Sequence, residues 1–317
     1  MNITEFVLKV GISDALDIFG EGVWEKVNLT FDQWEEQFVK WGKDRRLQKQ
    51  IFAKMVQTAS TVEHWTKHIW RLEPKDESLR LLGLQKIKEE YGAVDSLEQL
   101  AVWGMTFIKD VDLIYLQRAA ELAKTTEDWQ QVTAWARHVT GKLEAHAFQN
   151  LMRCAANEKT FHGWELAYHE TLPENPERKE ILSSLIELAQ TYEEWFKVWY
   201  WSRHDYKDLE KRALPQALAK ASTFDNVFAI FLNSEEGGNA KLLSTAKLWR
   251  SAENFGFGEW LAVYKVSGGE IKEAFLNKML EKATTLDDWL KVWRSTPDGS
   301  GAQGVACCRV RSFVDLK

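Results

Sequence analysis

The 317-residue chain has little of several residue types on which common protein classes depend. It contains five prolines, which suits a mostly helical chain because proline interrupts helices. Its three cysteines, Cys154, Cys307 and Cys308, are too few and too unevenly spaced for a disulfide framework or a zinc site. Cys154 falls within the apolar helical stretch LMRCA, so we expect it to be a small core residue.

Segments that would direct the chain to a membrane are also absent from the sequence. No stretch approaches about 18 consecutive apolar residues, so we expect no membrane-spanning helix. The N-terminus lacks the basic segment followed by an apolar run that marks a signal peptide. These absences predict a cytoplasmic location.

The sequence contains no recognisable catalytic or cofactor-binding set. There is no glycine-rich phosphate loop, no dinucleotide fingerprint and no supported nucleophile. His64 and His68 stand four residues apart beside Glu63, a spacing that can bind a metal, but no third ligand is evident. We expect both histidines to be solvated helix residues, and we predict no catalytic residue, cofactor or metal.

The charge balance disfavours some partners. Lysine and arginine number 41 and aspartate and glutamate 47, a net charge of −6. A mildly acidic chain has no general attraction for nucleic acid or for an anionic membrane. A protein or peptide is therefore the favoured partner.

Tryptophan is abundant, with sixteen residues, and much of it belongs to a repeated five-residue motif. We call this the Thr–Trp motif; six copies are clear and three are degenerate. The copies are TFDQW (30–34), TVEHW (61–65), AVDSL (93–97), TTEDW (125–129), TFHGW (160–164), TYEEW (191–195), TFDNV (223–227), GFGEW (256–260) and TLDDW (285–289). Their last positions are 29 to 35 residues apart, a regularity that chance does not produce.

Each position of the motif suits the start of a helix. The threonine is a preferred N-cap, because its hydroxyl accepts from a backbone N–H that the helix leaves unpaired. The acidic third position suits the positive end of the helix dipole. Gln33 and Glu194, at the fourth position, are expected to complete capping boxes. The fifth position, which we call the anchor, begins the buried stripe.

Helix-breaking residues follow each anchor and divide every repeat into two helices. They lie 8 to 13 residues after the anchor, at Gly42, Pro74, Asp110, Gly141, Pro173, Asp205, Gly237, Gly268 and Pro297. We expect a short first helix, which we call the motif helix, and a longer second helix. Such a unit cannot bury its apolar face alone, so neighbouring units must stack.

The sequence therefore predicts an all-α fold, a right-handed α-solenoid of about nine helix–turn–helix repeats of about 32 residues. Residues 1–29 are expected to form a partial or capping repeat, residues 30–294 the solenoid, and residues 295–317 an atypical tail or cap. The pattern resembles the α-solenoid superfamily of tetratricopeptide and HEAT-like repeats. Tetratricopeptide repeats carry glycine four residues after their tryptophan, whereas this chain has large residues there, such as Phe38, Tyr168 and Trp199.

A second set of tryptophans lies later in the motif helices. Trp41, Trp199 and Trp293 stand four or seven residues after an anchor, on its face, and are expected in the core. Trp103, Trp135 and Trp201 stand six residues after an anchor, on another flank. Aligned through stacked repeats, they would form an aromatic stripe for a partner. The alternative is that they pack between repeats or under loops.

Two repeats share a longer phrase, WARH (135–138) and WSRH (201–204). In each, a tryptophan and a histidine share one flank of the helix, and Arg137 and Arg203 point nearer the opposite side. The candidate binding residues are thus Trp103, Trp135, Arg137, His138, Trp201, Arg203 and His204. The alternative role for the basic residues is to complement the C-terminal end of the helix dipole.

Two functions remain open from the sequence. The first is a non-catalytic binding or scaffold protein that presents a repeat surface to a protein or peptide. The second is a HEAT-like nucleic-acid-binding protein, or an enzyme of the DNA glycosylase type, which would need a basic concave face with exposed aromatic residues. The absence of a catalytic set favours the first.

Overall fold

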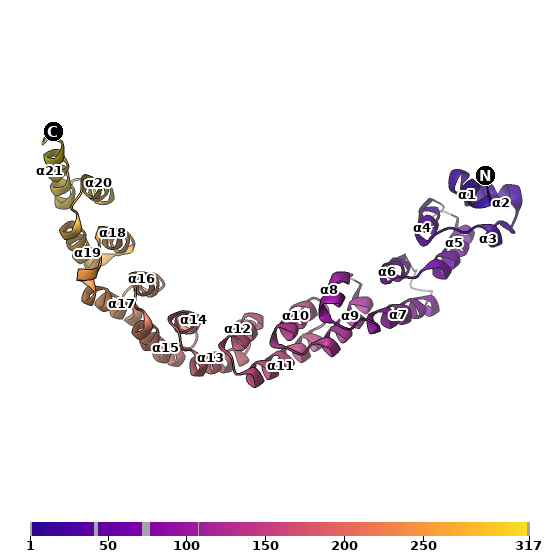
Figure 1. Cartoon of the computed structure of the whole chain (residues 1–317), viewed down its shortest axis with the longest axis horizontal. Helices are drawn as coiled ribbons and strands as arrows, with labels where there is room; N and C mark the ends of the chain where they lie inside the picture. The colour runs from indigo at the N-terminus through magenta and orange to yellow at the C-terminus, as the bar shows by residue number, and fades with distance from the viewer. Residues whose placement is uncertain (1, 41–43, 72–76, 107, 316–317) are drawn as a thin grey trace. The chain divides into compact units, whose positions relative to one another are not determined.

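The computed structural model describes residues 2–40, 44–71, 77–106 and 108–315, apart from the side chains of residues 45, 68–71, 79, 270 and 315. Every regular element in these ranges is a helix, so the all-α prediction is confirmed (Figure 1). The chain divides into two compact units, Met1–Glu158 (unit 1) and Lys159–Lys317 (unit 2). No helix within the described ranges has the length and apolar character needed to cross a membrane.

Unit 1 begins with three short helices, α1 (Ile3–Val10), α2 (Ile12–Phe19) and α3 (Val23–Lys26). Four motif helices follow, each in contact with the helix after it. The pairs are α4 (Phe31–Lys40) with α5 (Arg45–Thr58), α6 (Val62–Arg71) with α7 (Glu77–Gly92), α8 (Leu97–Trp103) with α9 (Lys109–Leu122), and α10 (Thr126–Ala136) with α11 (Gly141–Glu158).

Unit 2 repeats the same alternation. Its pairs are α12 (Phe161–Glu170) with α13 (Glu177–Leu188), α14 (Tyr192–Ser202) with α15 (Lys207–Lys220), α16 (Phe224–Leu232) with α17 (Asn239–Arg250), α18 (Phe257–Val266) with α19 (Gly269–Lys282), and α20 (Leu286–Ser295) with α21 (Gly301–Asp315). A 3-10 turn, η1 (Ala252–Asn254), follows α17. Neighbouring pairs touch: α13 contacts α15, and α18 contacts both α16 and α20.

The threonine hydroxyls start the motif helices as the sequence predicts. In seven copies the hydroxyl accepts from the backbone N–H three residues later, at 3.1 to 3.4 Å. Gln33 and Glu194 close the expected capping boxes, donor and acceptor both being present. Asp128 and Asp288 close two more, which the sequence reasoning missed because it considered only glutamate and glutamine.

The third copy of the motif was placed in the wrong register. Helix α8 begins at Leu97, and Ser96 is its N-cap, accepting from the Gln99 N–H at 3.2 Å. The motif there is SLEQL (96–100), and its anchor is the fully buried Leu100 rather than Leu97. The break after this helix is likewise Gly104, whose φ of +65° favours glycine, and not Asp110, which lies inside α9.

The anchors supply the core. Trp34, Trp65, Trp129, Trp164, Trp260 and Trp289 are buried, and Val227 is buried where the tryptophan is replaced. Trp195 is the exception, being only half-buried. In its helix, α14, Val198 and Trp199 are fully buried and take over the packing role.

The expectation of a core position holds for Trp199 and is wrong for Trp293, which is 44% exposed. Residues at the same place in preceding motif helices, such as Phe231 and Tyr264, are buried, and another motif helix follows each of them. No motif helix follows α20 in the described chain, so nothing of that kind covers Trp293. Trp41 lies outside the described residues.

Both ends of the chain pack onto their neighbours. Helices α1 to α3 share one buried cluster with α4 and α5, to which Val7, Ile12 and Trp24 contribute. The C-terminal segment forms α21, which contacts α20 and places Ala306 in a buried cluster of unit 2. Residues 296–300 form the break between these two helices.

Cys154 is half-buried rather than a core residue. The buried residues of this part of α11 are Leu151 and Ala155. The helical stripe therefore runs beside Cys154, whose Sγ lies 4.0 Å from the carbonyl oxygen of Lys124.

Replacing the anchor Trp129 with alanine should lower the free energy of unfolding by about 3–5 kcal/mol, because it empties a buried site between α10 and α11. Thr125→Ala should cost only about 1 kcal/mol, the usual cost of a lost N-cap. Urea unfolding of both variants measures the two losses. A smaller loss at Trp129 than at Thr125 would contradict the roles assigned to them.

The capping carboxylate of Glu194 should make stability depend on acid. Burial alone would raise its pKa, but hydrogen bonds from the N–H groups of Thr191 and Gln190 outweigh burial and hold the pKa below the ordinary 4.5. Its stabilisation is then complete above about pH 4.5 and is lost as the pH falls through the lowered value. Glu194→Gln should therefore lower the urea midpoint at pH 7 more than at pH 3.

The adjacent and exposed Glu193 offers a matched control for this measurement. Glu193→Gln removes the same charge from the same helical turn but leaves the capping box in place. Identical pH profiles for the two variants would show that the capping box does not carry the acid sensitivity.

Candidate functional site

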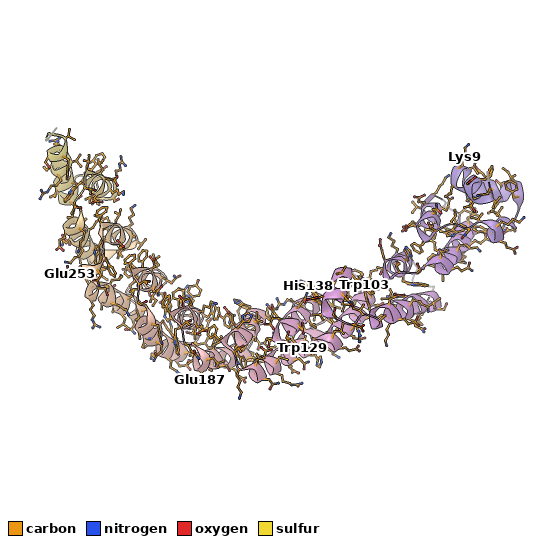
Figure 2. All side chains as sticks on the ribbon, in the orientation of Figure 1. Lys9, Trp103, Trp129, His138, Glu187 and Glu253 are labelled. Atoms are coloured by element: carbon orange, nitrogen blue, oxygen red, sulfur yellow. The ribbon has the colours of Figure 1, made fainter. Side chains whose placement is uncertain are left out.

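Trp103 lies at the end of α8 beside a groove of unit 1. The indole is 42% exposed and the neighbouring Val102 is 83% exposed, an unusual pairing of large apolar side chains at a surface. The groove has a volume of about 580 Å³. Its lining includes Val62, Glu63, Lys67, Glu90, Val102 and Trp103. Figure 2 labels Trp103 among the side chains of unit 1.

The register correction changes what Trp103 is equivalent to. It stands three residues after the anchor Leu100, whereas Trp135 and Trp201 stand six after theirs. The expected common register of the three tryptophans is therefore wrong for Trp103. Its greater exposure agrees with this different place on the helix.

A row of aromatic rings nevertheless connects Trp103 with Trp135. Trp103 contacts Tyr91 of α7 at 5.4 Å between ring centroids, Tyr91 contacts Tyr115 of α9 at 5.6 Å, and Tyr115 contacts Trp135 at 5.3 Å. Both tyrosines are buried, and burial raises the pKa of Tyr115 to about 12. Trp135 itself is half-buried, so it packs on the preceding helix pair and offers only part of its surface.

The basic residues of the phrase WARH lie where α10 ends. Arg137 is the C-cap residue, and its Nε lies 3.2 Å from a carboxylate oxygen of Glu144 on α11. His138 follows it and is exposed (Figure 2). Arg137 thus joins the two helices of one pair.

The phrase WSRH in unit 2 has different surroundings. Trp201 stacks on Tyr168 of α12 at 4.3 Å between ring centroids and makes a T-shaped contact with His169 at 5.4 Å. Arg178 donates to the Tyr168 hydroxyl at 2.6 Å. Trp201 is therefore half-buried between neighbouring pairs, which is the packing alternative that the sequence left open.

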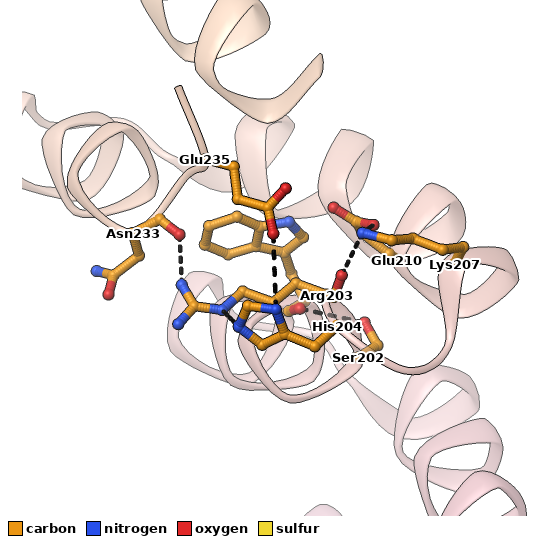
Figure 3. A network of polar contacts seen from close by, with 8 residues as sticks. Ser202, Arg203, His204, Lys207, Glu210, Asn233 and Glu235 are labelled. Atoms are coloured by element: carbon orange, nitrogen blue, oxygen red, sulfur yellow. Dashed lines mark hydrogen bonds and ion pairs between the residues drawn. The ribbon is translucent and has the colours of Figure 1, made fainter. Parts of the chain in front are cut away.

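Arg203 and His204 belong to a polar network at the end of α14 (Figure 3). The guanidinium donates to the backbone carbonyl of Asn233, at the end of α16, and its Nε donates to His204 Nε2 at 3.0 Å. Because Nε2 accepts, a neutral His204 carries its proton on Nδ1, which lies 3.6 Å from Glu235. Arg203 thus joins two successive pairs.

A cavity of about 170 Å³ adjoins this network. Trp199, Arg203, Lys207, Glu210 and Glu235 line it, together with the first residues of α17. Lys207 donates to Glu210 at 3.0 Å and to the carbonyl of Arg203. The sequence reasoning missed Lys207, Glu210 and Glu235 because they lie outside the motif helices, the first two in α15 and Glu235 in the loop before α17. The local signal nearest to them is Gly237, which the sequence identifies as the break before α17.

The other candidates from the sequence do not assemble into a site. His64 stacks on Phe31 at 4.3 Å, and its Nδ1 accepts from the Ser60 N–H. The side chain of His68 lies outside the described residues. In the described part of the chain, no three histidine, cysteine or acidic side chains come together as metal ligands would.

The comparisons with known proteins add no relative. No family model matches the sequence, and no curated protein or solved structure is significantly similar to it. The groove beside Trp103 and the cavity beside Arg203 are therefore the features that bear on function.

Proposed function

We propose that this chain is a non-catalytic binding or scaffold protein that holds a segment of a protein or peptide partner. In this proposal the helix pairs stack as a right-handed α-solenoid of about nine repeats, in the manner of tetratricopeptide and HEAT-like proteins. The succession of motif helix and longer partner helix in both units supports this arrangement. The three unpaired cysteines suit a reducing cytoplasm.

The groove beside Trp103 carries the proposal. Exposed large apolar side chains that line a hollow are typical of partner sites, because a ligand recovers the burial that they lack. Trp103 and Val102 together offer an exposed apolar surface of the kind that contributes most of the binding energy in many interfaces. We therefore expect an apolar residue of the partner to occupy this groove.

Charge around the groove favours a partner with basic residues beside that apolar residue. Among the described residues that line it, Glu63 and Glu90 are accompanied by a single lysine, Lys67. The Lys67 ammonium lies 3.1 Å from Glu63 and 3.6 Å from Glu35, so its charge is already matched. The described lining therefore carries more negative than positive charge. A partner of opposite charge is favoured, because complementary charges across an interface determine which partners bind.

The nucleic-acid alternative needs a basic face around the two WxRH phrases, and the contacts there do not favour it. Arg137 pairs with Glu144, and His204 stands beside Glu235. A phosphate backbone would have to compete with these carboxylates. The net charge of −6 acts in the same direction.

Selection of peptides from a random display library on the purified protein tests the proposed function. Peptides with an apolar residue flanked by lysine or arginine should be enriched. Trp103→Ala should weaken the binding of the selected peptides by about 30-fold, the loss expected for a hot-spot tryptophan. Isothermal titration calorimetry measures the affinities.

Trp293→Ala is the matched control, because this tryptophan is as exposed as Trp103 but lies in unit 2. It should leave the affinities unchanged. Failure to enrich any peptide, or equal losses in the two variants, would refute the proposed function at this groove.

A further inference from the structure

The cavity beside Arg203 has a helix N-terminus in its wall. Helix α17 begins at Asn239, and its N-cap, Gly238, has no side chain to accept from the first-turn N–H groups. Gly238, Asn239 and Ala240 all line the cavity. The N-terminal end of a twelve-residue helix carries partial positive charge and free donors, and both attract an anion.

A buried indole gives an independent sign of a missing ligand. Trp199 is 1% exposed and lines the same cavity, and its Nε1–H has no acceptor among the described residues. A buried donor without an acceptor destabilises a fold unless a ligand or water supplies one. Trp24 and Trp260 also lack an acceptor, but both belong to apolar core clusters, whereas Trp199 lines a cavity with polar walls.

Two cations, Arg203 and Lys207, are among the described residues that line the cavity, and Arg203 is the one without a carboxylate partner there. Lys207 pairs with Glu210, and His204 faces Glu235. The described hydrogen bonds of Arg203 go to uncharged groups, the Asn233 carbonyl and the His204 ring. A single negative charge placed here would meet Arg203 and the α17 N-terminus together, in the arrangement of Figure 3.

The size and charge of the cavity restrict which ligands it can bind. Its volume of about 170 Å³ admits a group the size of a carboxylate with a few attached carbons. A phosphate dianion would bring a second negative charge close to Glu210 and Glu235, which line the same walls. A singly charged planar carboxylate fits a guanidinium better.

We propose that Trp199, Arg203, Lys207 and the N-terminus of α17 form a binding site for a carboxylate group. Where the ligand is a peptide, which rests on the proposed function, this carboxylate is the C-terminus or an acidic side chain of that partner. The carboxylate accepts from the Trp199 indole and from the first-turn N–H groups of α17. Arg203 supplies the neutralising charge.

Acetate is the simplest probe of this site. In protein labelled with ¹⁵N at the tryptophan indoles, the Trp199 signal is identified by its loss in Trp199→Phe. Acetate, added against chloride at constant ionic strength, should move this signal downfield in a saturable way. Arg203→Gln should weaken the binding at least about tenfold, the effect of one charge-assisted hydrogen bond.

The equivalent arginine of the WARH phrase gives the matched control. Arg137→Gln removes the same group from the same position at the end of a motif helix, where the partner is Glu144. It should leave acetate binding unchanged. Lys207→Gln, at an exposed side chain, should weaken binding without unfolding the protein and so covers the case in which Arg203→Gln unfolds. A Trp199 signal that does not move with acetate, or equal effects of Arg203→Gln and Arg137→Gln, would overturn the site.

A peptide arm separates the two sources of the carboxylate. Peptides enriched on the wild-type protein are compared as C-terminal acids and amides, with and without their acidic side chains. If a peptide binds at least tenfold more tightly than acetate, and this gain is lost when its C-terminal carboxylate or its acidic side chain is removed, the site binds a peptide. Acetate binding without any such gain assigns it to a small carboxylate, and leaves the Trp103 groove to be judged by its own test. Peptide binding at Trp103 without an acetate response overturns the carboxylate site alone.

Discussion

The described fold depends on one local interaction, the hydrogen bond from a backbone N–H to the threonine hydroxyl that precedes it by three residues. It fixes where seven of the nine described motif helices begin, and the anchor then follows at a constant distance. Ser96 caps α8 in the same way, and Gly256 begins α18 without a side-chain cap. Capping carboxylates strengthen three of these starts by accepting two backbone N–H groups each. Because cap and anchor are tied together, the buried stripe keeps its phase from one pair to the next.

This coupling explains which parts of the fold were predictable. Where the cap is threonine and the anchor tryptophan, the sequence predicted the start of the helix, and it predicted a buried anchor correctly everywhere except at Trp195. The prediction failed at α8, where serine and leucine replace them and two alignments of similar quality compete. It failed again at Trp293, because burial there depends on whether a further motif helix follows, and helical spacing alone does not contain that information.

The candidate site was less predictable, for a related reason. WARH and WSRH are nearly identical locally, and both arginines occupy the C-cap. Their described partners nevertheless differ in kind: Arg137 pairs with the carboxylate of Glu144, and Arg203 donates to the backbone carbonyl of Asn233. The difference comes from residues some distance along the chain, such as Glu144 and Asn233. The helices of a repeat keep the same arrangement while the loops between them vary. Local sequence similarity therefore predicts where a side chain lies on its helix, but not which partners it contacts.

Trp199 belongs both to the buried core and to the candidate site. The core of α14 needs a large apolar side chain at this position, and phenylalanine or leucine would meet that need without a polar atom. Tryptophan adds a buried donor, which costs about 1–3 kcal/mol when it has no acceptor. Trp24 and Trp260 carry the same unpaired donor within apolar clusters, whereas Trp199 lines a cavity in which an acceptor could be placed. In the proposed site, a carboxylate held by Arg203 and the start of α17 satisfies this donor, and the same side chain would then serve the core through its rings and the ligand through its nitrogen.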